Sequence, residues 1–291
     1  MTDNATATHT LTLAVVGAGG KMGMRVSNNL ATTSHDVRYV ESSPSGQQRT
    51  REAGREVSDL ENAIDGADIV ILAVPDIALK PVTEQVVPHL AAGTVVLTLD
   101  PAAAYANQLF PRDDIHYAVA HPCHPSIFLR RTTEAEYADT FGGIAAPQDV
   151  VAAFEDDEPA KQAMTEEVIR AMYAPVIDVH WVTVKQLAQC EPTLVETIAC
   201  MIGEFLKESL NEAVNTMGVP EPAARSILLG HTQVALANAL QGDNPFSDAC
   251  MIAMRYGRDK LIKDDWKVIF RDDELDKNLQ AMLHLDAPIT R

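Results

Sequence analysis

The chain has 291 residues and carries 23 Lys and Arg against 41 Asp and Glu, a formal net charge of −18. This balance argues against nucleic acid or an anionic membrane surface as a partner, because both need basic patches, whereas a small anionic substrate needs only a few local cations. No apolar run approaches the ~20 residues of a membrane span, and the four cysteines have no paired spacing, which predicts reduced thiols in a cytoplasmic protein.

The polar residues 1–10 lack an apolar signal core and are expected to form a flexible tail. The apolar run LTLAVV, residues 11–16, is typical of a strand buried on both faces. Glycines follow it, and the apolar spacing then becomes helical. A strand, a glycine turn and a helix form a phosphate cradle, since glycines let the backbone approach a pyrophosphate and the helix start favours negative charge. The predicted cofactor residues here are Gly17, Ala18, Gly19, Gly20, Lys21, Met22 and Gly23.

The second strand, predicted over 37–40, ends on an acidic residue, Glu41. A carboxylate at this place accepts hydrogen bonds from a ribose 2′-hydroxyl and repels a 2′-phosphate. It therefore favours NAD over NADP as the cofactor. The alternative is a glycine turn with an unrelated surface glutamate.

Strands and helices alternate from here to about residue 181. We expect strands over 69–75, 94–101, 115–120, 142–146 and 176–179, and helices over 58–64, 79–90 and 159–173. Such alternation predicts a Rossmann domain with a doubly wound, mostly parallel sheet over residues 1–181. Open α/β sheets bind ligands at the carboxyl ends of their strands. The residues that this rule adds to the cofactor site are Ala73, Val74, Pro75 and Asp76.

From residue 182 the period is helical, which predicts an all-α domain over residues 182–291. Further helices are expected over 221–241, 245–257 and 272–283. The stripe that is expected to face inward comprises Leu187, Leu194, Ile198, Ile202, Phe205 and Met217.

Two histidines follow the strand at 115–120, in the sequence AHPCHPS. Its prolines stiffen the loop and fix the direction of the imidazoles. A histidine here can act as a base, hydrogen-bond a substrate or bind a metal. We expect His121 to be functional because it ends a strand. For His124 a rigid loop with a hydrogen-bonded imidazole is an equal alternative.

Glu191 is the second candidate, since helical spacing places it on the apolar stripe. A carboxylate buried there is costly unless it is paired or bound to a metal. Pro192 cannot donate a helical hydrogen bond, which predicts a kinked or restarted helix. A partly solvated glutamate at a helix break is the alternative. Glu196 lies further round the helix and is a weaker candidate.

The segments VVGAGGKMG, Gly142–Gly143 and VIDVHWVTVKQLAQ resemble the 6-phosphogluconate dehydrogenase and β-hydroxyacid dehydrogenase superfamily over most of the chain. That superfamily carries a catalytic Lys and then an Asn on its first long helix. Gln189 and Thr193 stand at these places, and Lys185 lies one turn earlier. The resemblance thus implies Lys185 as a catalytic candidate, and it implies a homodimer.

The HPCHP loop resembles the HPM loop of prephenate dehydrogenases, with a second His–Pro. His121 and Glu191 together suggest a bound metal, as in ketol-acid reductoisomerases, although the acid-rich motif of that family is absent. The whole pattern is similar to the D-apionate oxidoisomerase group. This resemblance implies NAD-dependent oxidation of the sugar acid D-apionate to 3-oxo-isoapionate, coupled to a carbon-skeleton rearrangement. It also implies a divalent metal, taken as zinc, on His121 and Glu191.

Two alternatives stay open. The first is a metal-independent hydroxyacid or prephenate-type dehydrogenase in which His121 is the acid/base. The second is an NAD-binding sensor without turnover, in which Gln189 marks a lost active site.

Overall fold

The computed structural model describes residues 10–242 and 244–289. The predicted flexible tail lies outside these residues except for Thr10. The chain forms two compact units, Met1–Ala188 together with Asp276–Arg291, and Gln189–Leu275. A domain boundary after residue 181 stays a prediction.

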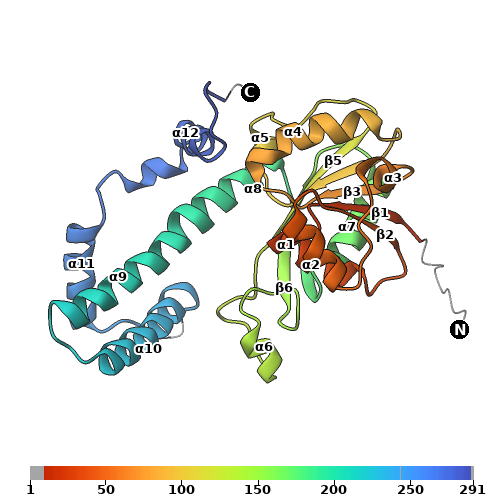
Figure 1. Ribbon diagram of the computed structural model, residues 1–291. Coiled ribbons are helices and arrows are strands. Elements are labelled where there is room, and N and C mark those ends of the chain that lie inside the picture. The colour runs from red at the N-terminus through yellow and green to blue at the C-terminus, as the bar shows by residue number, and fades with distance from the viewer. Residues whose placement is uncertain (1–9, 243, 290–291) are drawn as a thin grey trace, which may run out of the picture. The chain divides into compact units, whose positions relative to one another are not determined.

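A seven-stranded sheet runs through the first unit in the order β2-β1-β3-β4-β5-β6-β7 (Figure 1). Neighbouring strands are parallel except β5 and β6, where His121 lies opposite Val151 in an antiparallel pair. This confirms the predicted mostly parallel Rossmann sheet. The strands are β1 (Thr12–Val16), β2 (Asp36–Val40), β3 (Ile69–Leu72), β4 (Val95–Thr98), β5 (His116–Pro122), β6 (Gln148–Phe154) and β7 (Val176–Val182).

The core of this unit lies between the sheet and its helices. Strand β1 has neighbours on both sides, and its residues 13–16 are buried, as their apolar sequence predicts. Helices α1 and α7 pack against each other beside it. The helices of the unit are α1 (Lys21–Leu30), α2 (Pro44–Glu52), α3 (Leu60–Ile64), α4 (Asp76–Val86), η1 (Val87–His89), α5 (Ala102–Tyr105), α6 (Glu134–Ala138), α7 (Pro159–Met172) and α8 (Val184–Gln189).

The strand predicted over 142–146 is wrong, because residues 139–147 form a loop instead. Gly142 and Gly143 both have φ of +80°, which no strand accommodates. The loop winds around the carboxylate of Asp139, which accepts the backbone N–H groups of Gly142, Ile144, Ala145 and Ala146 at 2.9–3.1 Å. The strand begins only at Gln148.

The reversal of β6 decides where this loop lies. Strands β1, β3, β4 and β5 are parallel, so the loops that follow them emerge at one edge of the sheet. Because β6 is antiparallel to β5, the loop that precedes β6 lies at this same edge. Residues 139–147 therefore belong to the edge where open α/β sheets bind ligands.

The second unit is all-α, as predicted. It contains η2 (Cys190–Cys200), which is a π-helix, α9 (Met201–Asn215), α10 (Glu221–Leu240), α11 (Asp248–Leu261) and η3 (Trp266–Phe270). The last helix, α12 (Asp272–Met282), begins in this unit and ends in the first. No helix of the described residues has the length and apolar character that crossing a membrane requires.

The expectation that the apolar stripe faces inward is correct for Leu187, which is buried, and wrong further along. Leu194, Ile202 and Phe205 are 48%, 43% and 42% exposed, and Met217 is 74% exposed. Among the described residues from 194 to 274, Ala224 is the single buried residue. The helical period shows which face of a helix is apolar, but the described residues leave that face exposed beyond Leu187.

Candidate cofactor and catalytic site

The glycine turn between β1 and α1 is tightly packed against the end of β3. Gly17 has φ of +84°, and a Cβ atom there would lie 2.5 Å from the carbonyl oxygen of Ala73. Only glycine fits such a position. The amide of Gly20 donates to the carbonyl of Gly17 at 3.1 Å, and α1 begins directly afterwards at Lys21. The turn thus presents a helix start without side-chain bulk, the geometry that binds phosphate groups.

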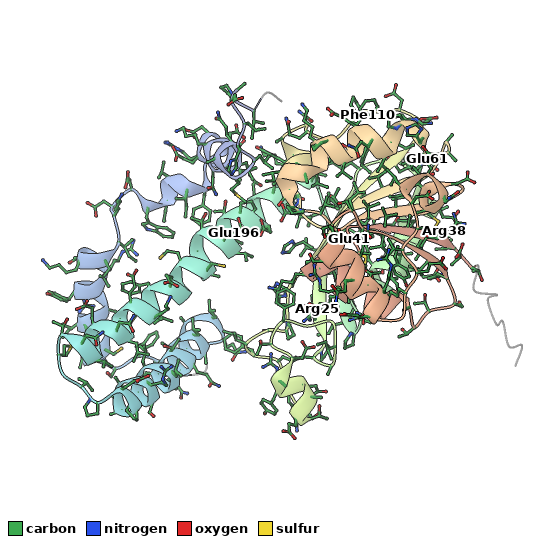
Figure 2. All side chains as sticks on the ribbon, viewed as in Figure 1. Arg25, Arg38, Glu41, Glu61, Phe110 and Glu196 are labelled. Carbon is green, nitrogen blue, oxygen red and sulfur yellow. The ribbon has the colours of Figure 1, made fainter. Side chains whose placement is uncertain are left out.

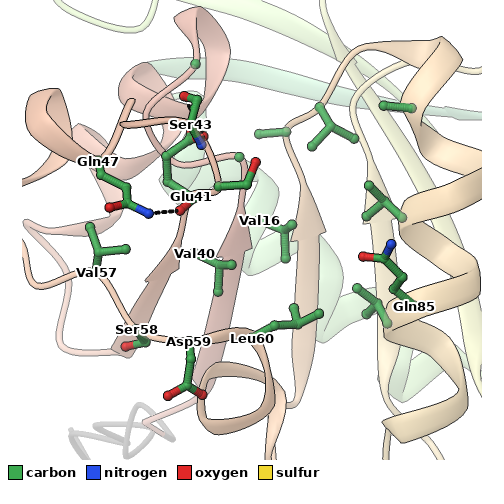
Figure 3. A pocket seen from close by; sticks show the side chains of 18 of the residues that line it. Val16, Val40, Glu41, Ser43, Gln47, Val57, Ser58, Asp59, Leu60 and Gln85 are labelled. Carbon is green, nitrogen blue, oxygen red and sulfur yellow. Dashed lines mark hydrogen bonds between the residues drawn. The ribbon is translucent and has the colours of Figure 1, made fainter. Parts of the chain in front are cut away.

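A cavity of about 700 Å³ opens beside this turn (Figure 3). It lies at the ends of β1, β2 and β3, and Val16, Val40, Ser43, Gln47, Leu60 and Gln85 are part of its lining (Figure 3). The lining includes six of the predicted cofactor residues, Gly17, Gly20, Glu41, Ala73, Val74 and Pro75. The others in the glycine turn, Ala18, Gly19, Lys21, Met22 and Gly23, continue the same segment without lining the cavity.

The carboxylate of Glu41 joins the end of β2 to the glycine turn. One of its oxygens accepts the backbone N–H of Gly19 at 3.0 Å, and the other accepts the N–H and hydroxyl of Ser43 at 2.8 and 2.9 Å. The Gln47 amide donates to the Glu41 carbonyl at 2.9 Å (Figure 3). Glu41 therefore holds a negative charge at the wall of the cavity, fixed in position by its neighbours.

Sequence reasoning missed helix α2 and its two arginines, Arg49 and Arg51, which also line the cavity. Arg49 is engaged with the glycine turn, because its Nε donates to the carbonyl of Gly19 at 2.9 Å. The signal in the sequence was the pair Ser43–Pro44. Ser43 caps the helix through the Gly46 N–H at 3.1 Å, and proline is favoured in a first helical turn.

His121 lies at the end of β5 and faces the segment that follows β4. Its Nδ1 is 3.2 Å from the carbonyl oxygen of Leu99 and 3.8 Å from a carboxylate oxygen of Asp100. A carbonyl only accepts, so this contact places the hydrogen on Nδ1 and leaves a lone pair on Nε2. Burial lowers the pKa of His121, although the charge of Asp100 opposes this. The imidazole is therefore neutral near pH 7 and can bind a proton or a metal.

Asp100 is the functional candidate that sequence reasoning missed in the catalytic region. Burial raises its pKa, partly offset by the Ala102 N–H, by the charge of His121 and by a side-chain hydrogen bond to Asp76. Two carboxyl groups that share a hydrogen bond hold a proton between them. This contact places Asp76 beside Asp100. The signal was available, since Asp100 follows the apolar strand β4 as Asp76 follows β3.

His124 lies beside His121, with ring centroids 6.5 Å apart. Its backbone has φ of +60°, in the left-handed region that non-glycine residues rarely adopt. Nδ1 of His124 lies 2.7 Å from the carbonyl oxygen of Phe141, and the two rings are in contact, with centroids 4.4 Å apart. His124 therefore connects the histidine loop to the loop around Asp139.

The remaining candidates lie on α8 and η2. Glu191 is buried, with 5% of its surface exposed. The helix does not restart at Pro192, because α8, η2 and α9 follow one another directly and the residues around Pro192 are π-helical. Lys185 is exposed on α8, and Glu196 is exposed on η2 (Figure 2). Gln189, at the place of the superfamily's catalytic lysine, donates to Asp272 at 3.2 Å. The roles predicted for Glu191 and Lys185 stay predictions.

A mostly parallel sheet with a glycine turn, an acidic residue after β2 and a cavity between them is typical of Rossmann-type, nicotinamide-dinucleotide-dependent oxidoreductases. The family described as acetohydroxy acid isomeroreductase, NADPH-binding domain, matches residues 8–172. The family described as phosphogluconate dehydrogenase (decarboxylating), C-terminal, matches residues 129–283. Both belong to the predicted superfamily, and its C-terminal part extends over the helical unit.

Curated relatives match nearly the whole chain. D-apionate oxidoisomerase of Pectobacterium atrosepticum is 58% identical over 95% of this chain and 97% of its own length. D-apionate oxidoisomerase of Blautia hydrogenotrophica is 41% identical over 96% of this chain and 98% of its own length. The chain belongs to the D-apionate oxidoisomerase family.

A solved structure has the same fold. The Cupriavidus necator protein described as a semialdehyde dehydrogenase NAD-binding protein, in complex with calcium and NAD, superposes with a TM-score of 0.91. It is 39% identical and covers 94% of this chain and 100% of its own.

Proposed function

We propose that this protein is an NAD-dependent oxidoisomerase that oxidises D-apionate and rearranges its carbon skeleton to give 3-oxo-isoapionate. The observation that carries the proposal is the 58% identity to the Pectobacterium enzyme along nearly the whole chain. The geometry supports it, because a dinucleotide cavity and a neutral, half-buried histidine lie at the same edge of one sheet.

NAD is the cofactor that these residues fit. The glycine turn from Gly17 to Gly23 would receive the pyrophosphate, and Ala73–Pro75 with Asp76 would border the cofactor further along. The carboxylate of Glu41 would accept the ribose hydroxyls and repel the 2′-phosphate of NADP. The NAD in the Cupriavidus necator structure supports this choice.

A divalent metal, for which we propose zinc, fits the donor groups of the catalytic region. His121 presents Nε2 while Leu99 holds its Nδ1–H, which is the arrangement of metal-binding histidines. Asp100 lies beside His121, with a carboxylate oxygen 3.8 Å from Nδ1, and offers the oxygen donor that a divalent cation prefers. Glu191 is the further ligand that we propose from its sequence position. When bound, the metal polarises the hydroxyl and carbonyl oxygens of the substrate, and the calcium of the Cupriavidus necator structure supports a cation site in the family.

The side chains of the protein then orient the substrate and assist the transfer of its protons. In the oxidation, a substrate hydroxyl loses its proton to water and its carbon gives a hydride to NAD, which forms a carbonyl and NADH. In the metal-independent alternative, Nε2 of His121 is not a metal ligand and would accept this proton instead. In the rearrangement, one carbon substituent moves from the neighbouring hydroxyl-bearing carbon to the new carbonyl carbon. The carbonyl and hydroxyl exchange places, and one proton passes between their oxygens without further redox change. Lys185 stays a candidate for assisting this transfer.

The first experiment measures NADH formation from NAD with D-apionate and with simple 2- and 3-hydroxy acids, with and without a chelator. We expect D-apionate turnover that stops in chelator and returns with added metal. Turnover of simple hydroxy acids that is indifferent to chelator would instead assign a metal-independent dehydrogenase with His121 as its acid/base. Tight NAD binding without turnover of any substrate would assign a sensor.

The Glu191→Gln substitution tests the metal assignment, with Glu196→Gln on the same helix as the matched control. We expect Glu191→Gln to abolish metal-dependent turnover and to leave the NAD dissociation constant nearly unchanged. Glu196 is exposed, so its substitution should change neither quantity. Loss of NAD affinity in Glu191→Gln would contradict the role proposed for this residue.

We further propose a cytoplasmic homodimer. All four cysteines are free thiols, which supports the cytoplasmic location. The helical unit buries a single residue between 194 and 274 among those described, and its helices expose large apolar side chains. A folded protein rarely leaves apolar patches of this extent open to water. A second copy of the same unit supplies a complementary apolar surface.

A further inference from the structure

Three side chains of α1 that lie one turn apart, Lys21, Arg25 and Asn29, all contact the segment around Asp139. Residues four positions apart share one face of a helix. Asn29 anchors the far end of this face by donating to the carbonyls of Gly143, Met172 and Ala174 at 3.1–3.2 Å. The face toward the start of α1 carries the two cations.

Both cations lie on the ring of Phe141. Nζ of Lys21 is 4.6 Å from the ring centroid, and the guanidinium carbon of Arg25 is 4.5 Å from it. Arg25 projects from α1 toward this loop (Figure 2). Gly143 leaves room for it, because a Cβ atom there would lie 3.0 Å from Cδ of Arg25. The ring holds two positive charges together that would otherwise repel each other.

The carboxylate beside this pair, that of Asp139, already accepts hydrogen bonds from the backbone. Asp139 lies 3.6 Å from Nη1 of Arg25, but its oxygens accept four backbone N–H groups. Nη1 of Arg25 is buried and makes no hydrogen bond to the described residues. The Arg25 side chain as a whole is 22% exposed, and the cluster carries two cations, Lys21 and Arg25, against the one carboxylate of Asp139. The cluster therefore suits an anionic ligand that supplies acceptor oxygens.

The cluster also lies close to His121 and His124. Phe141 contacts the ring of His124, which in turn lies beside His121. A sugar acid has its carboxylate within a few bonds of the hydroxyls that react. We propose that Lys21 and Arg25, held on Phe141, form the subsite that binds the carboxylate of the substrate. This inference rests on the proposed function, and it assigns Lys21 to the substrate rather than to the cofactor as the sequence predicted.

Such a subsite answers an electrostatic problem of this protein. With a net charge of −18, the chain as a whole repels an anionic substrate. A local pair of cations beside an aromatic wall reverses the potential where the substrate must bind. Arg25 can bind a carboxylate through two N–H groups, and Lys21 adds a point charge.

The test compares Lys21→Met, Arg25→Met and Arg25→Lys with Lys161→Met, a control on α7 in the same unit that lines neither the cavity nor the cluster. In the full-length protein we expect Lys21→Met and Arg25→Met each to raise KM for D-apionate at least about tenfold, the value of one charge-assisted hydrogen bond. KM for NAD should stay within about twofold, and Arg25→Lys should recover part of the loss. Thermal unfolding shows whether Arg25→Met has disturbed the loop around Asp139. Lys21 contacts the ring of Phe141, whereas Arg25 also lies beside Asp139, so the result for Lys21→Met is independent of such a disturbance.

Two outcomes overturn the subsite. A rise in KM for NAD that equals or exceeds the rise for D-apionate would mean that these cations bind the pyrophosphate of NAD. Unchanged KM values for both would mean that Lys21 and Arg25 bind neither ligand.

If the wild type does not turn over D-apionate, the proposed function fails by itself. The subsite is then tested by titrating the NADH complex with malonate and following NADH fluorescence. Wild-type binding that weakens about tenfold in Lys21→Met supports it, whereas equal affinity or no binding overturns it.

Discussion

The carboxylate of Asp139 decides the conformation of the loop that replaces the predicted strand. Its four backbone donors have no other acceptor in the loop, and its partner Arg25 lies on α1. We expect Asp139→Asn to lower the free energy of unfolding by about 2 kcal/mol, since hydrogen bonds to a buried charge are among the stronger ones. Urea denaturation measures this. Asp113→Asn, at an exposed position, is the control and should have little effect.

The same residue gives the protein a pH dependence of known sign. Burial alone would raise the pKa of Asp139, but its N–H donors outweigh burial and hold the pKa below the ordinary value. As the pH falls to the ordinary value of about 3.9, the unfolded chain takes up a proton that the folded chain does not. The stabilisation is therefore complete above that pH and is lost as the pH falls through the lower pKa of the folded state. The difference between wild type and Asp139→Asn in unfolding free energy should be constant from pH 6 to 8 and shrink below about pH 4.

Glu41 is the residue that should decide between the two nicotinamide cofactors. Substitution by Gln keeps an acceptor but removes the charge that repels a 2′-phosphate, and Arg49 and Arg51 line the same cavity. We expect the ratio of kcat/KM for NAD to that for NADP to fall at least about tenfold in Glu41→Gln. Glu52→Gln, at the end of α2, is the matched control. An unchanged ratio in Glu41→Gln would show that Glu41 serves only to hold the glycine turn.

Two glycines with positive φ, Gly142 and Gly54, allow the cost of backbone strain to be measured apart from the cost of a steric clash. An alanine there would have a φ of +80° and a Cβ atom 2.6 Å from Oε1 of Gln148, whose amide donates to the carbonyl of Tyr173 at 2.9 Å. Gly54 has φ of +77° but nothing within 4 Å of the added atom. We expect Gly54→Ala to cost about 1 kcal/mol from strain alone, and Gly142→Ala to cost about 1–3 kcal/mol more from overpacking. Equal losses in thermal or urea unfolding would mean that Gln148 moves aside freely.

The elements that the sequence predicted correctly are those whose signals are local. The run at β1, its glycine turn and α1 follow one another directly, and Glu41 has a fixed place after β2. The segment over 142–146 was predicted as a strand, whereas Asp139 and two glycines with positive φ hold it as a loop. Asp139 accepts hydrogen bonds from residues three to seven positions further along the chain. The alternation of apolar and polar residues that indicates a strand carries no information on such bonds.

Contacts between distant segments are the part of the site that local patterns could not supply. Asp100 and His121 are brought together only because β4 pairs with β5. Lys21 and Phe141 meet because β6 runs against β5, which returns its preceding loop to the edge where α1 begins. Neither pairing has a signal in the spacing of the residues themselves.

For the molecule as a whole, the exposed helices predict assembly. A single copy has a mass of 31.6 kDa, and we expect sedimentation equilibrium to give about twice this value. Phe205→Asp places a charge on an apolar face of α9 and should shift the protein toward the monomer. The control is Ile177→Asp, because Ile177 is 56% exposed on β7 of the Rossmann unit. This substitution should leave the sedimentation mass unchanged. A wild type that sediments as a monomer would contradict the proposed homodimer.

The uncovered apolar helices also give the protein a sensitivity to ionic strength. Each copy that approaches another carries the same large negative charge, so association sets the burial of apolar surface against long-range repulsion. Salt shortens the range of that repulsion to about 8 Å at physiological concentration, and excluded anions such as sulfate strengthen apolar burial as well. Two copies should therefore hold together more tightly as salt is added, and dilution into a buffer of low salt should be the condition that separates them.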